Sequence, residues 1–185
     1  KIVLSGEANE VADHYLASTM YSKSTSTSIE TQNFTVHSVN IYSLKGHSVI
    51  KTFDPVTITV RFTPKVPIAD PGVYAAILTP DGQRLTALDF KDFSTIDSIE
   101  QGAMVEMGFK IAELALLPGS YYMEIFIKDM AHHVFEQVQK SFPFEVVESP
   151  VYGGRHIDRW YGNFGLHAEP YSRIISQDDD NWQTS

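Results

Sequence analysis

The chain has 185 residues and a formal net charge of -9, with 43% hydrophobic and 20% charged residues. This composition is typical of a globular protein, and no apolar run approaches the ~20 residues that a membrane-spanning helix needs. The negative charge argues against nucleic acid as a ligand, because binding to phosphates requires a surplus of cations. The sequence contains no cysteine, which excludes both a disulfide framework and a thiolate metal site.

Residues 1–19 predict one strand and one helix that cannot form a core by themselves. Ile2-Val3-Leu4 is a short apolar strand, and Glu7 to Leu16 carry apolar residues at helical spacing. They are either an N-terminal decoration of the main domain or the remnant of a preceding domain, and we favour the remnant. Residues 20–32 are rich in Ser and Thr, which is the composition of a linker.

Residues 33–149 predict a β-sandwich, because short alternating strands recur with turns between them. The alternation is most regular from Val56 to Thr63, and the prolines of Pro64 to Pro71 predict an irregular connection there. Pro143 should place a bulge or bend in the last strand. The predicted strands are 34–42, 49–53, 56–63, 73–78, 84–90, 103–111, 116–129 and 134–147.

The strand at 116–129 is the predicted centre of the fold. It follows a Pro-Gly turn and places Tyr121, Met123, Ile125 and Ile127 on one face, because strand side chains alternate with period two. The Gly-x-Tyr pattern resembles the tyrosine corner of immunoglobulin-like sandwiches. We therefore expect Tyr121 to be buried with its hydroxyl bonded to nearby backbone.

The opposite face of this strand predicts a carbohydrate-binding site. Tyr122, Glu124 and Phe126 lie on that face, and Arg61 and Tyr74 fall on the non-core side of their own strands. An aromatic ring can cover the C–H face of a sugar while charged groups bond its hydroxyls. The alternative stays open that this face packs against a partner chain or against the aromatic residues of the C-terminal extension.

The sequence predicts neither a catalytic residue nor a metal site, and it implies no cofactor. No Gly-x-Ser-x-Gly motif is present, and the histidines are scattered, with His132 and His133 adjacent rather than at ligand spacing. The run Asp178 to Asp180 lacks the Gly and Glu of a calcium loop. Glu106 and Glu124 remain a weak alternative, as a carboxylate pair for glycoside hydrolysis.

Residues 150–185 form a predicted C-terminal extension. Its residues Trp160, Tyr161 and Phe164 are too apolar to remain in water on a polar tail. We predict that they form a homodimer interface. Whether this segment is exchanged as a strand between the two copies stays open.

Five motifs follow one another along the predicted sandwich: Pro55 to Phe62, Ile68 to Val73, Asp81-Gly82-Gln83, Leu117 to Tyr121 and Phe144 to Val147. In this order they resemble the C-terminal domain of Wzt, the ATP-binding subunit of ABC transporters that export bacterial O-antigen polysaccharide. The similarity covers roughly Phe34 to Glu148, and Gly6 to Tyr15 resemble the last strand and helix of such ATPase domains. No Walker A sequence occurs.

The resemblance implies a carbohydrate-binding module without enzymatic activity. Such a module would recognise end-modified O-antigen polysaccharide in the cytoplasm, at the inner face of the inner membrane, and couple it to export. Its implied partners are the polysaccharide, a second copy of the chain and, through the parent protein, the membrane-spanning transporter subunit. The acidic composition fits a neutral glycan better than an anionic one. The alternative is a structural dimerisation domain of the same subunit that does not contact the glycan.

Overall fold

The computed structural model of the protein describes residues 28–46, 48–94, 96–150, 152–153, 162–168, 170 and 172. The strand and helix predicted for residues 1–19 and most of the predicted linker lie outside these residues. Across the described part of the chain, no helix is both long and apolar enough to span a membrane. The described residues fold mainly into β-strands.

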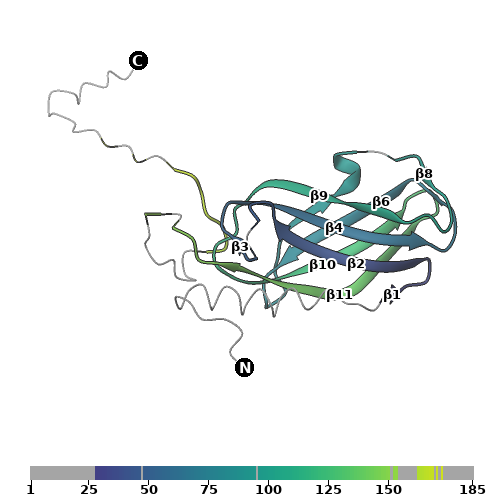
Figure 1. The fold of residues 1–185 in the computed structure, drawn as a ribbon, viewed down its shortest axis with the longest axis horizontal. Helices are drawn as coiled ribbons and strands as arrows, with labels where there is room; N and C mark the ends of the chain where they lie inside the picture. Colours follow the sequence, from purple (N-terminus) through teal and green to yellow (C-terminus); the bar gives the residue numbers. More distant parts are fainter. Residues whose placement is uncertain are drawn as a thin grey trace, which may run out of the picture.

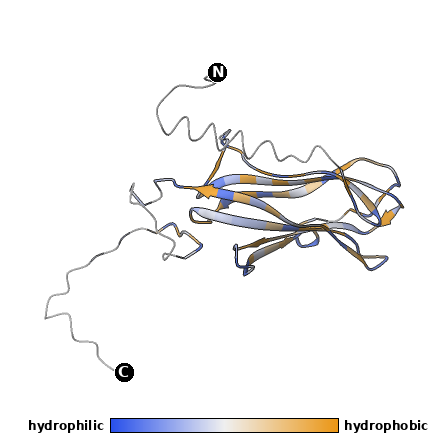
Figure 2. Ribbon diagram, turned by 90° about the horizontal axis from the view of Figure 1, so that it is seen from below, coloured by the Kyte–Doolittle hydropathy of each residue, from blue (hydrophilic) through white to orange (hydrophobic). Residues whose placement is uncertain are grey.

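Two sheets face each other and form two layers, which Figure 2 shows in side view. The four-stranded sheet has the order β1-β2-β4-β9, and the five-stranded sheet has the order β3-β11-β10-β6-β7. Their strand pairs are antiparallel, apart from the parallel pair of β3 and β11. The immunoglobulin-like β-sandwich predicted from the sequence is confirmed.

The strand bounds follow the predicted strands closely. In Figure 1 the strands run lengthwise, with β1 and β8 towards one end and β3 towards the other. The four-stranded sheet contains β1 (Ile29–Glu30), β2 (Phe34–Ser43), β4 (Asp54–Pro64) and β9 (Val105–Leu114). The five-stranded sheet contains β3 (Ile50–Lys51), β6 (Pro71–Leu78), β7 (Arg84–Asp89), β10 (Gly119–Asp129) and β11 (Val134–Val147). A short 3-10 helix, η1 (Phe90–Asp92), follows β7.

Three details differ from the sequence prediction or refine it. Strand β1 pairs with β2, so the sandwich begins before residue 33, inside the segment predicted as linker. The connection predicted to be irregular contains β5 (Ile68–Ala69), which pairs with β8 (Ser98–Ile99). The bulge expected near Pro143 lies just before it, because the register of β11 against β10 shifts between Gln139 and Phe142.

Strand β10 lies in the interior of its sheet, between β11 and β6, and its inner face supplies the centre of the core. Met123, Ile125 and Ile127 are at most 1% exposed, and Tyr121 is 4% exposed. Burial of side chains of this size stabilises a fold by about 1.5–3 kcal/mol each. The largest fully buried side chains contributed by the facing β2 and β4 are Phe34, Val36, Val56, Ile58, Val60 and Phe62.

The tyrosine corner predicted at the start of β10 is confirmed. The Tyr121 hydroxyl donates a buried hydrogen bond of 2.7 Å to the carbonyl oxygen of Leu117. The ring of Tyr121 stacks on Phe144 of β11, with 5.7 Å between the ring centroids. The side chain thus fixes the turn before β10 to the strand itself.

We expect Tyr121→Phe to lower the free energy of unfolding by about 1–2 kcal/mol, because it removes a buried hydrogen bond while leaving the ring in place. Urea denaturation followed by circular dichroism measures the change. Tyr42→Phe is a matched control, since Tyr42 lies on β2 of the other sheet and is 38% exposed. Equal stability of Tyr121→Phe and the wild type would contradict a structural role for this hydroxyl.

A buried carboxylate fixes the corner between β2 and β4. The Asp54 side chain is 2% exposed and lies 3.1 Å from Lys45 Nζ. It accepts hydrogen bonds from the Ser43 hydroxyl at 3.0 Å and from the Lys51 amide at 2.9 Å. Burial alone would raise the pKa of Asp54, but the Lys51 amide, Lys45 and Ser43 outweigh burial and hold the pKa below its ordinary value.

The lowered pKa of Asp54 predicts a pH dependence of stability. Because its folded pKa is below its unfolded pKa, its contribution is present above the unfolded value of about 3.9 and is lost as the pH falls through the folded pKa. Asp54→Asn should therefore lower the free energy of unfolding by about 1–3 kcal/mol at pH 7, and the difference from wild type should shrink below pH 4. Denaturant titrations across this pH range measure it, and a difference that stays constant with pH would contradict the assignment.

Candidate carbohydrate-binding face

The outer face of the five-stranded sheet brings together four of the five residues predicted to bind carbohydrate. Tyr122, Glu124 and Phe126 are half-buried and alternate with the buried residues of β10, as predicted. Tyr74 joins them from β6, because it is the direct cross-strand partner of Phe126. In the same register Ala76 lies opposite Glu124. The next outward position on β6 after Tyr74 is therefore a small side chain.

Three aromatic side chains meet on this face and form what we call the aromatic cluster: Tyr74, Phe126 and Phe135. Phe126 and Phe135 stack with 4.5 Å between ring centroids and an interplanar angle of 17°. Tyr74 meets both rings edge-on, with centroid distances of 5.8 Å to Phe126 and 6.0 Å to Phe135. Phe135 is 53% exposed. The cluster therefore presents apolar ring surface to solvent on the outside of the sheet.

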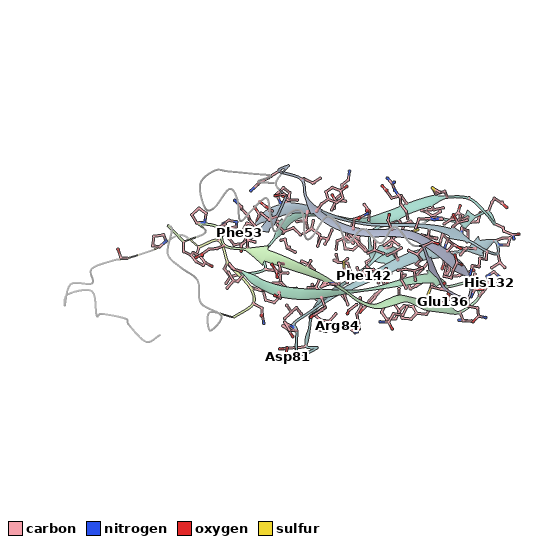
Figure 3. All side chains as sticks on the ribbon, turned by 60° about the horizontal axis from the view of Figure 1, so that its bottom comes forward. Phe53, Asp81, Arg84, His132, Glu136 and Phe142 are labelled. Atoms are coloured by element: carbon pink, nitrogen blue, oxygen red, sulfur yellow. The ribbon has the colours of Figure 1, made fainter. Side chains whose placement is uncertain are left out.

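A charged pair adjoins the cluster on the side of β7. The Arg84 guanidinium lies 6.0 Å from the centroid of the Tyr74 ring, and its Nη2 is 3.4 Å from Oε2 of Glu124. Figure 3 shows Arg84 on the outer side of the five-stranded sheet. A half-exposed pair of this length contributes little to stability. Both groups can therefore exchange partners with hydroxyls of a ligand at small cost.

Two lysine–aspartate pairs border the other end of the face. The side chain of Lys128 on β10 is 6% exposed and pairs with Asp89 on β7, and Lys91 pairs with Asp70. Gly72 lies between the two lysines, and a Cβ there would come 3.2 Å from Cε of Lys128. Each cation is thus matched by a carboxylate, so this border adds no net positive charge to the face.

Arg61 does not belong to this site, which corrects the prediction for this residue. It lies on β4 of the four-stranded sheet and forms an ion pair with Glu106 of β9. Alternation along a strand shows that a side chain points away from the core, but a sandwich has two outer faces. Glu106 and Glu124 also lie on different sheets. They therefore do not form the carboxylate pair that was considered for glycoside hydrolysis.

Sequence reasoning missed Phe135 and Arg84. Both lie on predicted strands, and both follow turns whose register decides which face they share with β10. Phe135 is the cross-strand partner of Lys128, and Arg84 is the partner of Leu78 after a register shift. Phe135 shares the face of Phe126 because Lys128 pairs with Phe135 across the hairpin, whereas simple continuation of the period-two count from 116–129 would place Phe135 on the opposite face. The register shift beside Arg84 likewise leaves no signal in the alternation.

Two hollows lie beyond the face, and none of the five predicted binding residues lines either of them. The first has a volume of ≈ 420 Å³ and contains the hydrogen-bonded pair of Asp129 and His132, whose Oδ2 and Nδ1 atoms are 2.6 Å apart. Figure 3 shows His132 and Glu136 at this end of the molecule. Its lining is Asn33, Phe34, Val66, Pro67, Ile68, Asp129, His132 and Val134. The second, of ≈ 450 Å³, is lined by Thr79, Pro80, Asp81, Gln83, Pro118, Gly119, Ser120, Tyr121, Gly162 and Asn163.

Within the described residues, no group of three or more His, Cys, Asp or Glu side chains is arranged to hold a metal ion. The run Asp178 to Asp180 lies outside the described part of the chain.

The described part of the C-terminal extension packs against its own domain. Phe164 forms a bridge with Leu116, the Leu117 amide donates to the Asn163 carbonyl at 2.9 Å, and the Gly165 amide donates to the Ala115 carbonyl at 2.7 Å. The His167 ring stacks on Phe53 with 3.9 Å between centroids. Trp160 and Tyr161 lie outside the described residues. The dimer interface predicted for Trp160, Tyr161 and Phe164 stays a prediction.

Comparison with known proteins decides the family. Residues 25–157, which are more than half of the chain, match the family described as the Wzt C-terminal domain. The chain belongs to the Wzt C-terminal domain family. The resemblance seen in the sequence motifs is thereby confirmed, and the matched region begins before residue 33, as strand β1 does.

The fold agrees with this membership. A structure titled "Crystal structure of the C-terminal domain of wzt" superposes with a TM-score of 0.63 at 15% sequence identity, covering 80% of this chain and 88% of that chain. AlkC, an alkylpurine DNA glycosylase from Pseudomonas fluorescens bound to DNA containing an abasic site analog, gives a TM-score of only 0.44 at 16% identity, over 63% of this chain and 31% of that chain. That likeness carries no argument. A search of curated proteins finds no match.

Proposed function

We propose that this Wzt C-terminal domain binds O-antigen polysaccharide on the outer face of the five-stranded sheet and does not alter it chemically. The observation that carries the proposal is the aromatic cluster beside the Arg84–Glu124 pair. An exposed apolar platform next to a donor and an acceptor matches the two surfaces of a sugar ring. The site would be Tyr74, Arg84, Tyr122, Glu124, Phe126 and Phe135, with Arg61 no longer part of it.

The platform follows the direction of β10. From Tyr122 to Phe126 the strand advances ~13 Å at its usual rise per residue, which leaves room for more than one sugar ring. The rings of the cluster would stack on C–H faces, while Arg84 donates to hydroxyl pairs and Glu124 accepts from them. Each stacked ring or charged hydrogen bond would add about 1–2 kcal/mol, which gives a weak and readily reversible complex. Such affinity suits a chain that must be passed on.

Charge favours a neutral repeat unit. The cations near the face are matched by the carboxylates of Glu124, Asp89 and Asp70, and the chain as a whole carries a net charge of -9. A phosphate or carboxylate on every repeat would meet acidic groups at this surface. We therefore propose a neutral polysaccharide.

Family membership suggests where this binding takes place. We propose that the domain acts in the cytoplasm, at the inner face of the inner membrane, as part of the ATP-binding subunit of an O-antigen ABC transporter. It would recognise the end-modified polysaccharide and present it to the membrane-spanning subunit for export. The domain itself would not be an enzyme.

One observation favours a second function. Phe135 is 53% exposed, and a partner chain could cover it and the rest of the aromatic cluster. The domain would then be a structural dimerisation domain of the transporter subunit, without glycan contact. In that case the chain would not bind the polysaccharide, and loss of a ring from the cluster would weaken dimerisation.

We expect Tyr122→Ala and Phe126→Ala each to reduce the affinity for the end-modified polysaccharide by about 5- to 30-fold, because each removes a ring worth about 1–2 kcal/mol from the platform. Arg84→Ala should weaken binding in the same direction. Isothermal titration calorimetry of the full chain with polysaccharide from the encoding bacterium measures the affinities. Polysaccharide without its terminal group shows whether the end is recognised.

The molecule offers matched controls on its other face. Tyr42→Ala and Arg61→Ala remove the same side-chain types from the four-stranded sheet, and both variants should bind as the wild type does. Circular dichroism and light scattering check that every variant keeps its fold and oligomeric state. Folded Tyr122→Ala and Phe126→Ala variants with wild-type affinity would place the site elsewhere, with the loops at 64–71 and 93–102 as the next candidates.

A further inference from the structure

The second hollow, of ≈ 450 Å³, lies directly beyond one end of the aromatic and charged face described above. Leu78 of β6 pairs with Tyr122 of β10 on one side and with Arg84 of β7 on the other, so the three residues form one row across the sheet. The hollow is lined by the next residue of each strand past this row: Thr79, Gln83 and Tyr121. A ligand that lies on the face and extends past Tyr122 therefore reaches the hollow.

Ser120 connects the hollow to this face along β10. It lines the hollow, is exposed, and shares the outer side of the strand with Tyr122, Glu124 and Phe126, because strand side chains alternate. From Ser120 to Phe126 the strand advances ~20 Å at its usual rise per residue. One polysaccharide chain along β10 could thus contact the aromatic cluster at one end and the hollow at the other.

The hollow differs in chemistry from the aromatic cluster. Its volume falls within the range of roughly 300–1,000 Å³ that is common for small-molecule sites. Among the described residues that line it there is no lysine, arginine or histidine, so it offers no cation to a phosphate or carboxylate. Hydroxyl, carboxamide and carboxylate groups supply the donors and acceptors that sugar hydroxyls need. The polar side chains of the lining belong to Thr79, Asp81, Gln83, Ser120 and Asn163.

The β6–β7 turn holds one side of the hollow in a fixed shape. The Thr79 amide donates to the Gln83 carbonyl at 2.9 Å, and the Gln83 amide donates to the Thr79 hydroxyl at 3.0 Å. The Thr79 hydroxyl also bonds the Asp81 carboxylate, which orients this side chain. A carboxylate has about four acceptor positions, so Asp81 can accept from a ligand at the same time. Figure 3 shows Asp81 and Arg84 on the same side of the molecule.

The C-terminal segment supplies the opposite side of the hollow. The Asn163 carbonyl accepts a hydrogen bond of 2.9 Å from the Leu117 amide, and the Leu117 carbonyl accepts the hydroxyl of Tyr121. Asn163 is therefore fixed against the turn before β10, and it is half-buried in the lining of the hollow. Side chains held in place before a ligand arrives lose less conformational entropy on binding.

We propose that the second hollow is a separate subsite of the glycan site, which binds one neutral sugar unit through its hydroxyl groups. The inference rests on the proposed binding of polysaccharide to the outer face of the five-stranded sheet. The two subsites divide the recognition: the aromatic cluster stacks on C–H faces, the hollow bonds hydroxyls, and Arg84 lies between them. The C-terminal segment thereby gains a function, because Asn163 completes the subsite. The side chains that bond the sugar unit are Asp81, Gln83, Ser120 and Asn163.

Substitution of the two carboxamides tests the subsite in the full chain. We expect Gln83→Ala and Asn163→Ala each to lower the affinity for the end-modified polysaccharide by about 2- to 10-fold, because a neutral hydrogen bond contributes a factor of this size. Isothermal titration calorimetry with polysaccharide from the encoding bacterium measures the affinities, and circular dichroism checks the fold.

Matched controls lie elsewhere on the molecule. Gln101 is exposed in the turn before β9, and Asn40 is half-buried on β2 of the four-stranded sheet. Gln101→Ala and Asn40→Ala remove the same side-chain types and should bind the polysaccharide as the wild type does.

The carboxamide groups also report contact directly. In nuclear magnetic resonance spectra, the side-chain NH₂ signals of Gln83 and Asn163 should shift when the polysaccharide is added, while those of Gln101 and Asn40 should not. The spectra of the four alanine variants assign these signals. Signals of Gln83 and Asn163 that stay in place at saturation would overturn the subsite.

The outcomes separate failure of the subsite from failure of the proposed function. Wild-type affinity of Gln83→Ala and Asn163→Ala, together with weakened binding by Phe126→Ala, would overturn the subsite and leave glycan binding at the aromatic cluster intact. Wild-type affinity of all three variants, or no binding of polysaccharide by the wild type, would overturn both. Weakened binding by all three, with the two side-chain signals shifted, is the result expected.

Discussion

The register of β10 between β11 and β6 is the constraint on which the rest of the structure depends. It directs Met123, Ile125 and Ile127 into the core and Tyr122, Glu124 and Phe126 to the outside. A slip by one residue would exchange the two sets, exposing the core residues and burying a carboxylate. The tyrosine corner fixes the start of this strand, so the same contact that stabilises the core also positions the outer face.

The two outer faces of the sandwich differ in chemistry because of this arrangement. The five-stranded sheet presents aromatic rings beside a weakly paired arginine and glutamate. This arrangement leaves apolar ring surface in contact with water, which is unfavourable unless a ligand or a partner covers it. The outer positions of β4 and β9 instead carry Thr57, Thr59, Arg61 and Glu106. This difference in chemistry is why the proposed glycan site is assigned to the five-stranded sheet and not to the four-stranded one.

The sequence predicts the layers well and the site only in part. Period-two alternation is a local property, so the inner face of β10 and the outward direction of Tyr74 and Arg61 follow from sequence alone. Which outward residues become neighbours depends on strand order and on register, and these are set by turns and bulges that leave a weak signal. Arg61 was therefore assigned to a face it does not share, and Phe135, across the turn of the β10–β11 hairpin, was missed.

The most direct test of the central claim is to map the ligand surface by nuclear magnetic resonance. Backbone amide shifts of the full chain would be followed while end-modified polysaccharide is added. Binding on the five-stranded sheet predicts shift changes concentrated on β6, β10 and the first half of β11, centred on Tyr74, Phe126 and Phe135. Changes centred on the four-stranded sheet around Arg61, or in the loops 64–71 and 93–102 with the aromatic cluster unaffected, would contradict the account.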